Sequence, residues 1–129
     1  MNAKYISFEG IGGTGKTYFF NKLKKKYNNS KTHIFLEEIS DEIHSGLNKQ
    51  IFSALFHTKN RFFDMGLPLT ETMLLLANKF NQYESVLHNS LNTGKIVVQD
   101  RGFDTVAIYQ SLVILRAYYL DITIHNLVK

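Results

Sequence analysis

The chain has 129 residues, of which 44% are hydrophobic, so it can fold as one domain with one core and is not a disordered tail. It contains no cysteine, which excludes disulfides and thiolate metal sites and suits a cytoplasmic protein. The net charge of +4 is modest and gives no reason to expect a nucleic-acid partner. The sequence lacks a run of about 18 apolar residues, so we expect no membrane span.

A glycine-rich stretch near the N-terminus is the strongest signal in the chain. Residues 10–17 read Gly-Ile-Gly-Gly-Thr-Gly-Lys-Thr and fit the phosphate-binding loop pattern G-x-x-x-x-G-K-[ST]. A buried strand is predicted over residues 4–9 and a helix over residues 17–27, with Phe19 on the side that faces the sheet. Strand, loop and helix in this order are the setting in which such a loop binds a nucleotide.

The residue types of this loop suit a triphosphate. Glycines let backbone N–H groups approach the phosphates, and the N-terminus of the following helix adds a partial positive charge. Lys16 is expected to reach the β- and γ-phosphates, and Thr17 to place its hydroxyl on Mg²⁺. The predicted ATP-binding residues are Gly10, Gly12, Gly13, Thr14, Gly15, Lys16 and Thr17.

Two carboxylates lie at the C-terminal end of the second predicted strand, which covers residues 33–37. Ligands of open α/β sheets bind at the carboxyl ends of strands, so Glu37 and Glu38 could face a pocket. They could equally begin the next loop or helix, where acidic groups are also favoured. The sequence leaves both readings open. A helix is then predicted over residues 41–57.

A long helix is predicted from an N-cap at Thr70 to about residue 92, and Gly94 suits a left-handed residue after its end. Apolar residues at helical spacing indicate which side of this helix is buried. They are Met73, Leu76, Phe80, Tyr83, Leu87 and Leu91.

The third predicted strand, residues 95–99, carries Asp100 and Arg101 at its carboxyl end. An acidic residue at this place, after a phosphate-binding loop earlier in the chain, is where nucleotide-binding proteins hold Mg²⁺ or its waters. The fork-shaped guanidinium of arginine suits phosphate. Helices are predicted over residues 103–115 and from residue 116 onward, with a strand over residues 120–124 as the alternative.

These elements predict an α/β fold of the P-loop NTPase type, a three-layer α/β/α arrangement around a parallel sheet that is incomplete, with about three strands. At this point the chain resembles the thymidylate kinase family of nucleoside-monophosphate kinases. The resemblance is carried by residues 8–17, by residues 74–79, which read Leu-Leu-Leu-Ala-Asn-Lys, and by residues 94–110, which contain Asp-Arg and end in Tyr-Gln.

The resemblance implies transfer of the ATP γ-phosphoryl to a deoxynucleoside monophosphate, with dTMP to dTDP as the first expectation. It implies Lys16, Asp100 and Arg101 as catalytic residues, and Thr17 and Asp100 as the residues that hold Mg²⁺. The implied acceptor-binding residues are Glu38, Lys79, Arg101, Tyr109 and Gln110. It also implies a homodimer, and a single domain over residues 1–129 that corresponds to the N-terminal portion of a P-loop kinase, without the lid and the C-terminal strands.

Several positions differ from the family pattern. Gly12 stands where an acidic residue is usual, Glu37 where an arginine is usual and Lys79 where an arginine is usual, while Leu75 replaces an aromatic residue and Gly102 a tyrosine. Two further hypotheses therefore remain beside a monophosphate kinase. One is a deoxynucleoside kinase in which a carboxylate at position 38 acts as base on a 5′-hydroxyl. The other is a truncated protein that binds ATP without catalysis.

Overall fold

A computed structural model describes residues 3–39, 46–55 and 66–120. Its centre is a three-stranded parallel sheet in the order β1-β3-β2, built from β1 (Lys4–Phe8), β2 (His33–Leu36) and β3 (Ile96–Asp100). The middle strand β3 pairs along its whole length with β1, and its residues 97–100 are buried. Burial of consecutive residues, which point to opposite faces, is typical of a central strand covered on both faces.

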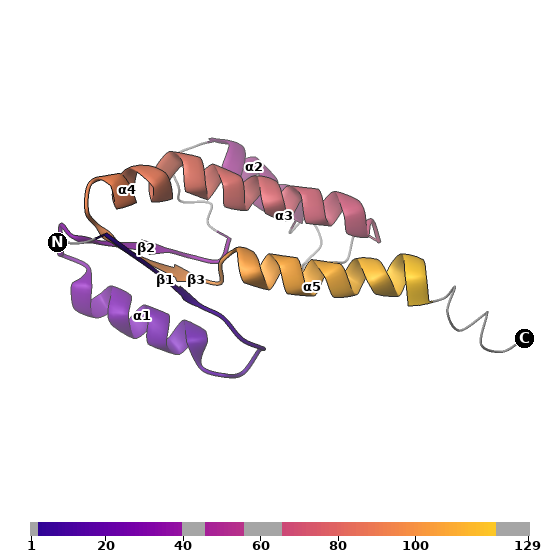
Figure 1. Cartoon of the computed structure of the whole chain (residues 1–129), viewed down its shortest axis with the longest axis horizontal. Coiled ribbons are helices and arrows are strands. Elements are labelled where there is room, and N and C mark those ends of the chain that lie inside the picture. The colour runs from indigo at the N-terminus through magenta and orange to yellow at the C-terminus, as the bar shows by residue number, and fades with distance from the viewer. Residues whose placement is uncertain (1–2, 40–45, 56–65, 121–129) are drawn as a thin grey trace, which may run out of the picture.

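Helices cover both faces of this sheet, as Figure 1 shows. Helix α1 lies on one face, and α3, with the helical turns that follow it, lies on the other, so the predicted three-layer α/β/α fold with an incomplete sheet is confirmed within the described residues. Helix α5 continues from the carboxyl end of β3 and packs on α3. The bounds are α1 (Lys16–Tyr27), α2 (Gly46–Leu55), α3 (Pro68–Gln82), the π-helical turn η1 (Tyr83–Leu87), α4 (His88–Asn92), α5 (Phe103–Leu115) and the π-helical turn η2 (Arg116–Leu120).

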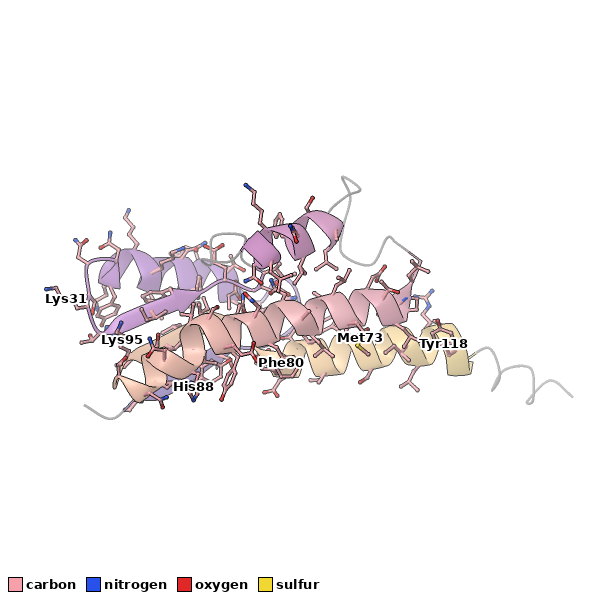
Figure 2. All side chains as sticks on the ribbon, turned by 90° about the horizontal axis from the view of Figure 1, so that it is seen from above. Lys31, Met73, Phe80, His88, Lys95 and Tyr118 are labelled. Atoms are coloured by element: carbon pink, nitrogen blue, oxygen red, sulfur yellow. The ribbon has the colours of Figure 1, made fainter. Side chains whose placement is uncertain are left out.

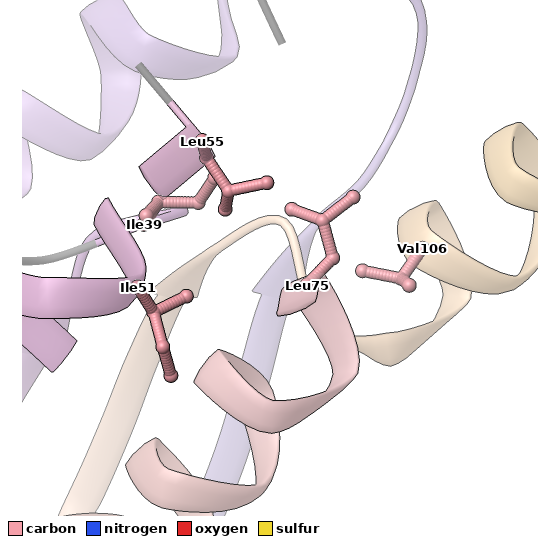
Figure 3. Packing of buried hydrophobic residues seen from close by; sticks show 5 residues of the cluster. All are labelled: Ile39, Ile51, Leu55, Leu75 and Val106. Carbon is pink, nitrogen blue, oxygen red and sulfur yellow. The ribbon is translucent and has the colours of Figure 1, made fainter. Parts of the chain in front are cut away.

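Two hydrophobic clusters hold the layers together. The first joins the end of β2 to three helices, and its buried members are Ile39, Ile51, Leu55, Leu75 and Val106 (Figure 3). The second lies between the sheet and the helix pair η1–α4, with Leu36, Leu87 and Val97 at its centre. Leu75 and Val106 belong both to the first cluster and to the wall of the cavity described below, so packing and site share the same side chains.

The prediction for the buried side of α1 was wrong by one residue. Phe19 is 57% exposed, whereas Phe20 is 1% exposed and meets Phe35 edge to face, with ring centroids 5.7 Å apart. The helix begins at Lys16, which is itself buried, so the row that faces the sheet runs from position 16 through position 20. One residue of offset turns a helical side chain by about 100°.

The predicted buried face of the long helix was also wrong at three positions. Met73, Phe80 and Tyr83 are 63%, 53% and 41% exposed. The face of α3 that is turned inward is mostly polar, because it borders the carboxyl edge of the sheet, where the functional groups gather. Its buried residues are Glu71, Thr72, Leu75, Asn78, Lys79 and Gln82.

The observed start of the long helix differs slightly from the predicted one. Helix α3 begins at Pro68, a residue suited to the first helical position, and the preceding Leu67 gives no side-chain cap, so Thr70 is not the N-cap. Gly94 has φ 77°, which confirms the left-handed residue after the helix. The expectations for residues 41–45, 56–65 and 121–129 lie outside the described residues. Among the described helices, none combines the length and the apolarity needed to cross a membrane.

Candidate functional site

The glycine loop follows β1 and leads directly into α1. Gly10, Gly13 and Gly15 have φ of 135°, 82° and 85°, a region that side chains rarely adopt. A Cβ on Gly13 or Gly15 would meet nothing within 4 Å, so backbone conformation, and not crowding, requires glycine at these two positions. Gly12 has neither constraint in the structure.

Lys16 is the first residue of α1 and is buried, with 9% of its surface exposed. Its ammonium lies across the loop, where Nζ donates to the carbonyl oxygen of Ile11 at 2.5 Å and to Thr14 Oγ1 at 3.2 Å. Thr14 Oγ1 in turn donates to the same Ile11 oxygen at 2.9 Å. A positive charge is thus held inside a loop of backbone groups at the start of a helix, an arrangement that favours an anion.

Thr17 and Asp100 meet between α1 and β3. Thr17 Oγ1 donates to Asp100 Oδ2 at 3.2 Å, while Asp100 Oδ1 is buried and has no hydrogen-bond partner among the described residues. A hydroxyl and a carboxylate with an unpaired oxygen fit Mg²⁺, which prefers oxygen ligands and keeps several waters of its own. Within the described ranges no cluster of three or more His, Asp and Glu side chains forms a metal cage, so water and phosphate oxygens would complete the coordination.

The five predicted acceptor-binding residues come together in one cavity. Glu38 follows β2, Lys79 lies on α3, Arg101 follows β3, and Tyr109 and Gln110 lie on α5. The cavity itself is small, about 70 Å³, which is below the range of about 300–1,000 Å³ usual for small-molecule sites. Its apolar wall is formed by Ile39, Leu75 and Val106.

The charged groups of this cavity interact with one another. Arg101 Nη1 donates to Glu38 Oε1 at 3.2 Å, and the guanidinium carbon lies 5.8 Å from the centre of the Tyr109 ring. Of the two carboxylates after β2, Glu38 lines the cavity, whereas Glu37 lines the adjoining hollow and pairs with Lys24 at 2.8 Å. The arginine is placed between a carboxylate and an aromatic face and is thereby kept at the cavity wall.

Lys79 is the most deeply buried charge of the cavity, with 2% exposed. Its Nζ donates to the carbonyl oxygens of Glu38 and Arg101, at 2.6 Å each. The pKa of Lys79 is lowered to about 8, chiefly by burial and to a smaller extent by the nearby Arg101, although the carboxylates of Glu38, Glu9 and Asp100 oppose the shift. The side chain thus carries its proton at neutral pH but loses it at mildly alkaline pH.

Gln110 lines the cavity and has an unpaired donor. Its Oε1 accepts a hydrogen bond from Thr72 Oγ1 at 2.6 Å, whereas Nε2 is buried without a partner among the described residues. An unsatisfied buried amide is costly, so such a group calls for a water or a ligand oxygen.

The cavity adjoins the hollow beside the glycine loop. The second hollow shares Glu38 and Ile39 with the cavity, and its other lining residues are Thr17, Phe20, Asn21, Glu37 and Asp100. The start of α1, the candidate Mg²⁺ ligands and the cavity are therefore neighbours at the carboxyl edge of the sheet.

Glu9 is a residue of the site for which the sequence patterns predicted no role. Its Oε1 accepts a hydrogen bond from the Gly102 N–H at 2.7 Å, and its Oε2 accepts one from Thr105 Oγ1. Burial alone would raise the pKa of this carboxyl, but the hydrogen bonds from Thr105 and Gly102, together with Ser7 and the charge of Lys79, keep the pKa below its ordinary value. An acidic residue at the end of a buried strand, directly before the loop, was the available signal.

Comparison with known proteins agrees with this geometry. The sequence profile described as "Thymidylate kinase" matches residues 8–122. The thymidylate kinase of Onion yellows phytoplasma is 36% identical over 111 residues, which covers 82% of this chain and 48% of the relative. That of Mycoplasma mobile is 32% identical over 111 residues, covering 84% of this chain and 51% of the relative. The chain thus spans about half the length of the curated relatives it matches.

A solved structure agrees as well. The crystal structure of thymidylate kinase from Ehrlichia chaffeensis superposes with a TM-score of 0.65 at 25% identity, over 85% of this chain and 56% of that one. The profile covers far more than half of the chain, and the most similar relatives named above exceed 30% identity. The chain belongs to the thymidylate kinase family.

Proposed function

We propose that the protein of which this chain forms the described part transfers the γ-phosphoryl group of ATP to dTMP and yields dTDP. The observation that carries the proposal is that the hollow lined by Thr17 and Asp100 shares Glu38 and Ile39 with the cavity that contains Arg101. A donor triphosphate at Lys16 and an acceptor phosphate at Arg101 would then face each other at one edge of the sheet. We place this reaction in the cytoplasm, where nucleotide pools and ATP are found.

The donor side of the proposal consists of the loop and its lysine. Backbone N–H groups of residues 10–17 would surround the β- and γ-phosphates, and Lys16 would exchange its contact with the Ile11 carbonyl for phosphate oxygens. The binding residues would be those predicted from the sequence: Gly10, Gly12, Gly13, Thr14, Gly15, Lys16 and Thr17. Mg²⁺ held by Thr17 and Asp100 would supply charge neutralisation of the phosphate oxygens.

The acceptor side consists of the cavity. Arg101 would bind the phosphate of dTMP, and Lys79 would add positive charge behind it, while Gln110 Nε2 would donate to a carbonyl of the base. Glu38 would repel a free phosphate, but its pairing with Arg101 offsets part of that charge. Tyr109 would lie beside the sugar and base.

The reaction depends on the positions of the two phosphate groups more than on proton transfer. A bond forms between an acceptor phosphate oxygen and the γ-phosphorus, and the bond from that phosphorus to the β,γ-bridging oxygen breaks, so that ADP leaves. The acceptor phosphate is already an anion at neutral pH, and no general base is required. Lys16 and Arg101 would neutralise charge on the moving group and hold the two phosphates in line.

Family membership does not favour the deoxynucleoside kinase or the ATP-binding protein without catalysis. One experiment distinguishes both alternatives from the proposal. Calorimetry with ATP and Mg²⁺ is combined with a turnover assay that compares dTMP with thymidine. We expect the affinity for ATP to fall about 100-fold in Lys16→Ala. We also expect the parent to phosphorylate dTMP and not thymidine. Equal ATP affinity of parent and Lys16→Ala would overturn the proposal, turnover of thymidine would support the first alternative, and binding without product the second.

We further propose that residues 1–129 form the N-terminal portion of one P-loop kinase domain, which the half-length coverage of the relatives supports. We also propose a homodimer through the outer face of α3, where Met73 and Phe80 are exposed (Figure 2). Sedimentation equilibrium should show a dimer for the parent and a monomer for Met73→Lys. The control Tyr18→Lys alters an equally exposed residue on α1 and should remain a dimer; a monomeric parent would exclude the contact.

A further inference from the structure

The peptide unit between Arg101 and Gly102 has an unusual conformation. Arg101 has φ 58° and is the one non-glycine residue with positive φ among those described. A side chain in this region is strained, and such residues persist only where their surroundings hold them. The residue is also the arginine of the acceptor cavity, so whatever holds its backbone also sets the direction of its guanidinium.

The carbonyl end of this peptide unit is bound by an ammonium. Lys79 reaches from α3 and donates from Nζ to the Arg101 oxygen at 2.6 Å and to the Glu38 oxygen at the same distance. A single buried charge thereby ties together the chain segments that leave β2 and β3. Hydrogen bonds with one charged partner are about twice as strong as those between neutral groups.

The N–H end of the same unit is bound by a carboxylate. Gly102 N–H donates to Glu9 Oε1 at 2.7 Å, and Thr105 Oγ1 fixes the other oxygen of that carboxylate. The Arg101 N–H itself donates to the Phe8 oxygen at 3.1 Å, so the turn is attached to the end of β1.

Glycine at position 102 makes this close approach possible. A Cβ there would lie 2.6 Å from the Tyr5 hydroxyl and 3.1 Å from Glu9 Oε1, and both distances are shorter than ordinary contact. A side chain at position 102 would require the Tyr5 hydroxyl to move and the Glu9 carboxylate to shift slightly, whereas glycine leaves both in place.

We propose that Glu9 and Lys79 are a pair of positioning residues that hold the Arg101–Gly102 peptide between a carboxylate and an ammonium and so direct the Arg101 guanidinium into the acceptor cavity. The charges match the peptide dipole, because the negative group faces the N–H and the positive group faces the carbonyl. The inference rests on the proposed function, in that Arg101 binds the acceptor phosphate. Glu9 itself acts through Arg101, since it does not line the cavity.

The first test is independent of any nucleotide. The ¹⁵Nε–¹H signal of Arg101 and its heteronuclear NOE are recorded in the parent chain and in Glu9→Gln, which preserves size and removes the charge. We expect an ordered side chain in the parent, and a shifted signal with a smaller NOE in Glu9→Gln and in Lys79→Met. The controls are Glu84→Gln and Lys22→Met, which remove exposed charges elsewhere and should leave the signal unchanged. An unchanged signal in Glu9→Gln would overturn the proposal.

The second test is a double-mutant cycle on dTMP affinity measured by calorimetry. Glu9→Gln should weaken dTMP binding about tenfold, the size expected for misplacing one charge-assisted hydrogen bond, and should leave ATP affinity unchanged. In an Arg101→Met background the same substitution should have no further effect, because the group it positions is gone. Additive losses would refute positioning through Arg101. If the parent fails to bind dTMP, the proposed function fails, while the arginine signal still decides this inference.

Discussion

The packing of α1 gives a sharp prediction from two neighbouring phenylalanines. Phe20 of α1 is 1% exposed and packs against Phe35 of β2, whereas Phe19 is 57% exposed. Removing a fully buried phenylalanine ring costs about 3–5 kcal/mol, which includes the cavity it leaves. Removing an exposed one changes stability by about 0.5 kcal/mol or less. We therefore expect Phe20→Ala to lower the free energy of unfolding by about 3–5 kcal/mol and Phe19→Ala to leave it nearly unchanged.

The measurement is urea unfolding followed by far-ultraviolet circular dichroism, with the two variants as mutual controls because they make the same chemical change. For a chain of this length the Phe20→Ala loss corresponds to a fall in Tm of about 10–20 °C. The denaturant slope should stay constant in both variants, as it does when only the native state is affected. Equal losses in the two variants, or a larger loss in Phe19→Ala, would show that α1 is rotated from the orientation described above.

Three further outcomes test other parts of the structure. The pKa of Lys79 is about 8 in the folded chain against an ordinary 10.5, so the unfolded chain binds more protons than the folded chain between these pH values. In urea titrations, the free energy of unfolding of the parent relative to that of Lys79→Met should therefore rise by about 1 kcal/mol from pH 7 to pH 9. A constant difference would contradict the burial of that ammonium. Gly15→Ala should cost about 1–2 kcal/mol from its φ of 85° alone, since no atom would contact the new methyl group, and a neutral effect in the same titration would exclude that conformation. Gly102→Ala should be destabilising, and Tyr5→Phe should reduce the loss by removing the hydroxyl that the methyl meets at 2.6 Å; identical losses in both backgrounds would exclude that contact.

Local sequence determined the elements and the chemistry near the glycine loop. Residues 10–17 carry their conformation in their own glycines, and Phe103–Leu115 is a helix with the bounds that its pattern predicts. The pattern of residues 95–99 predicted a strand with Asp100 directly after it, although the observed strand β3 includes that residue. These features depend on neighbours within a few positions, which is why one sequence suffices to predict them.

Tertiary structure alone decided which faces are buried and which charges meet. The side of α1 that faces the sheet depends on the residue at which the helix begins, and α3 turns a polar face inward because it borders the site, not because its own pattern requires it. Glu9 and Gly102 are 93 residues apart, and no local pattern links them. Such contacts follow from strand register and helix docking, which depend on many weak interactions over the whole chain. The chemical groups of the site can be predicted from the sequence, but the packing of the layers decides which of them are in contact.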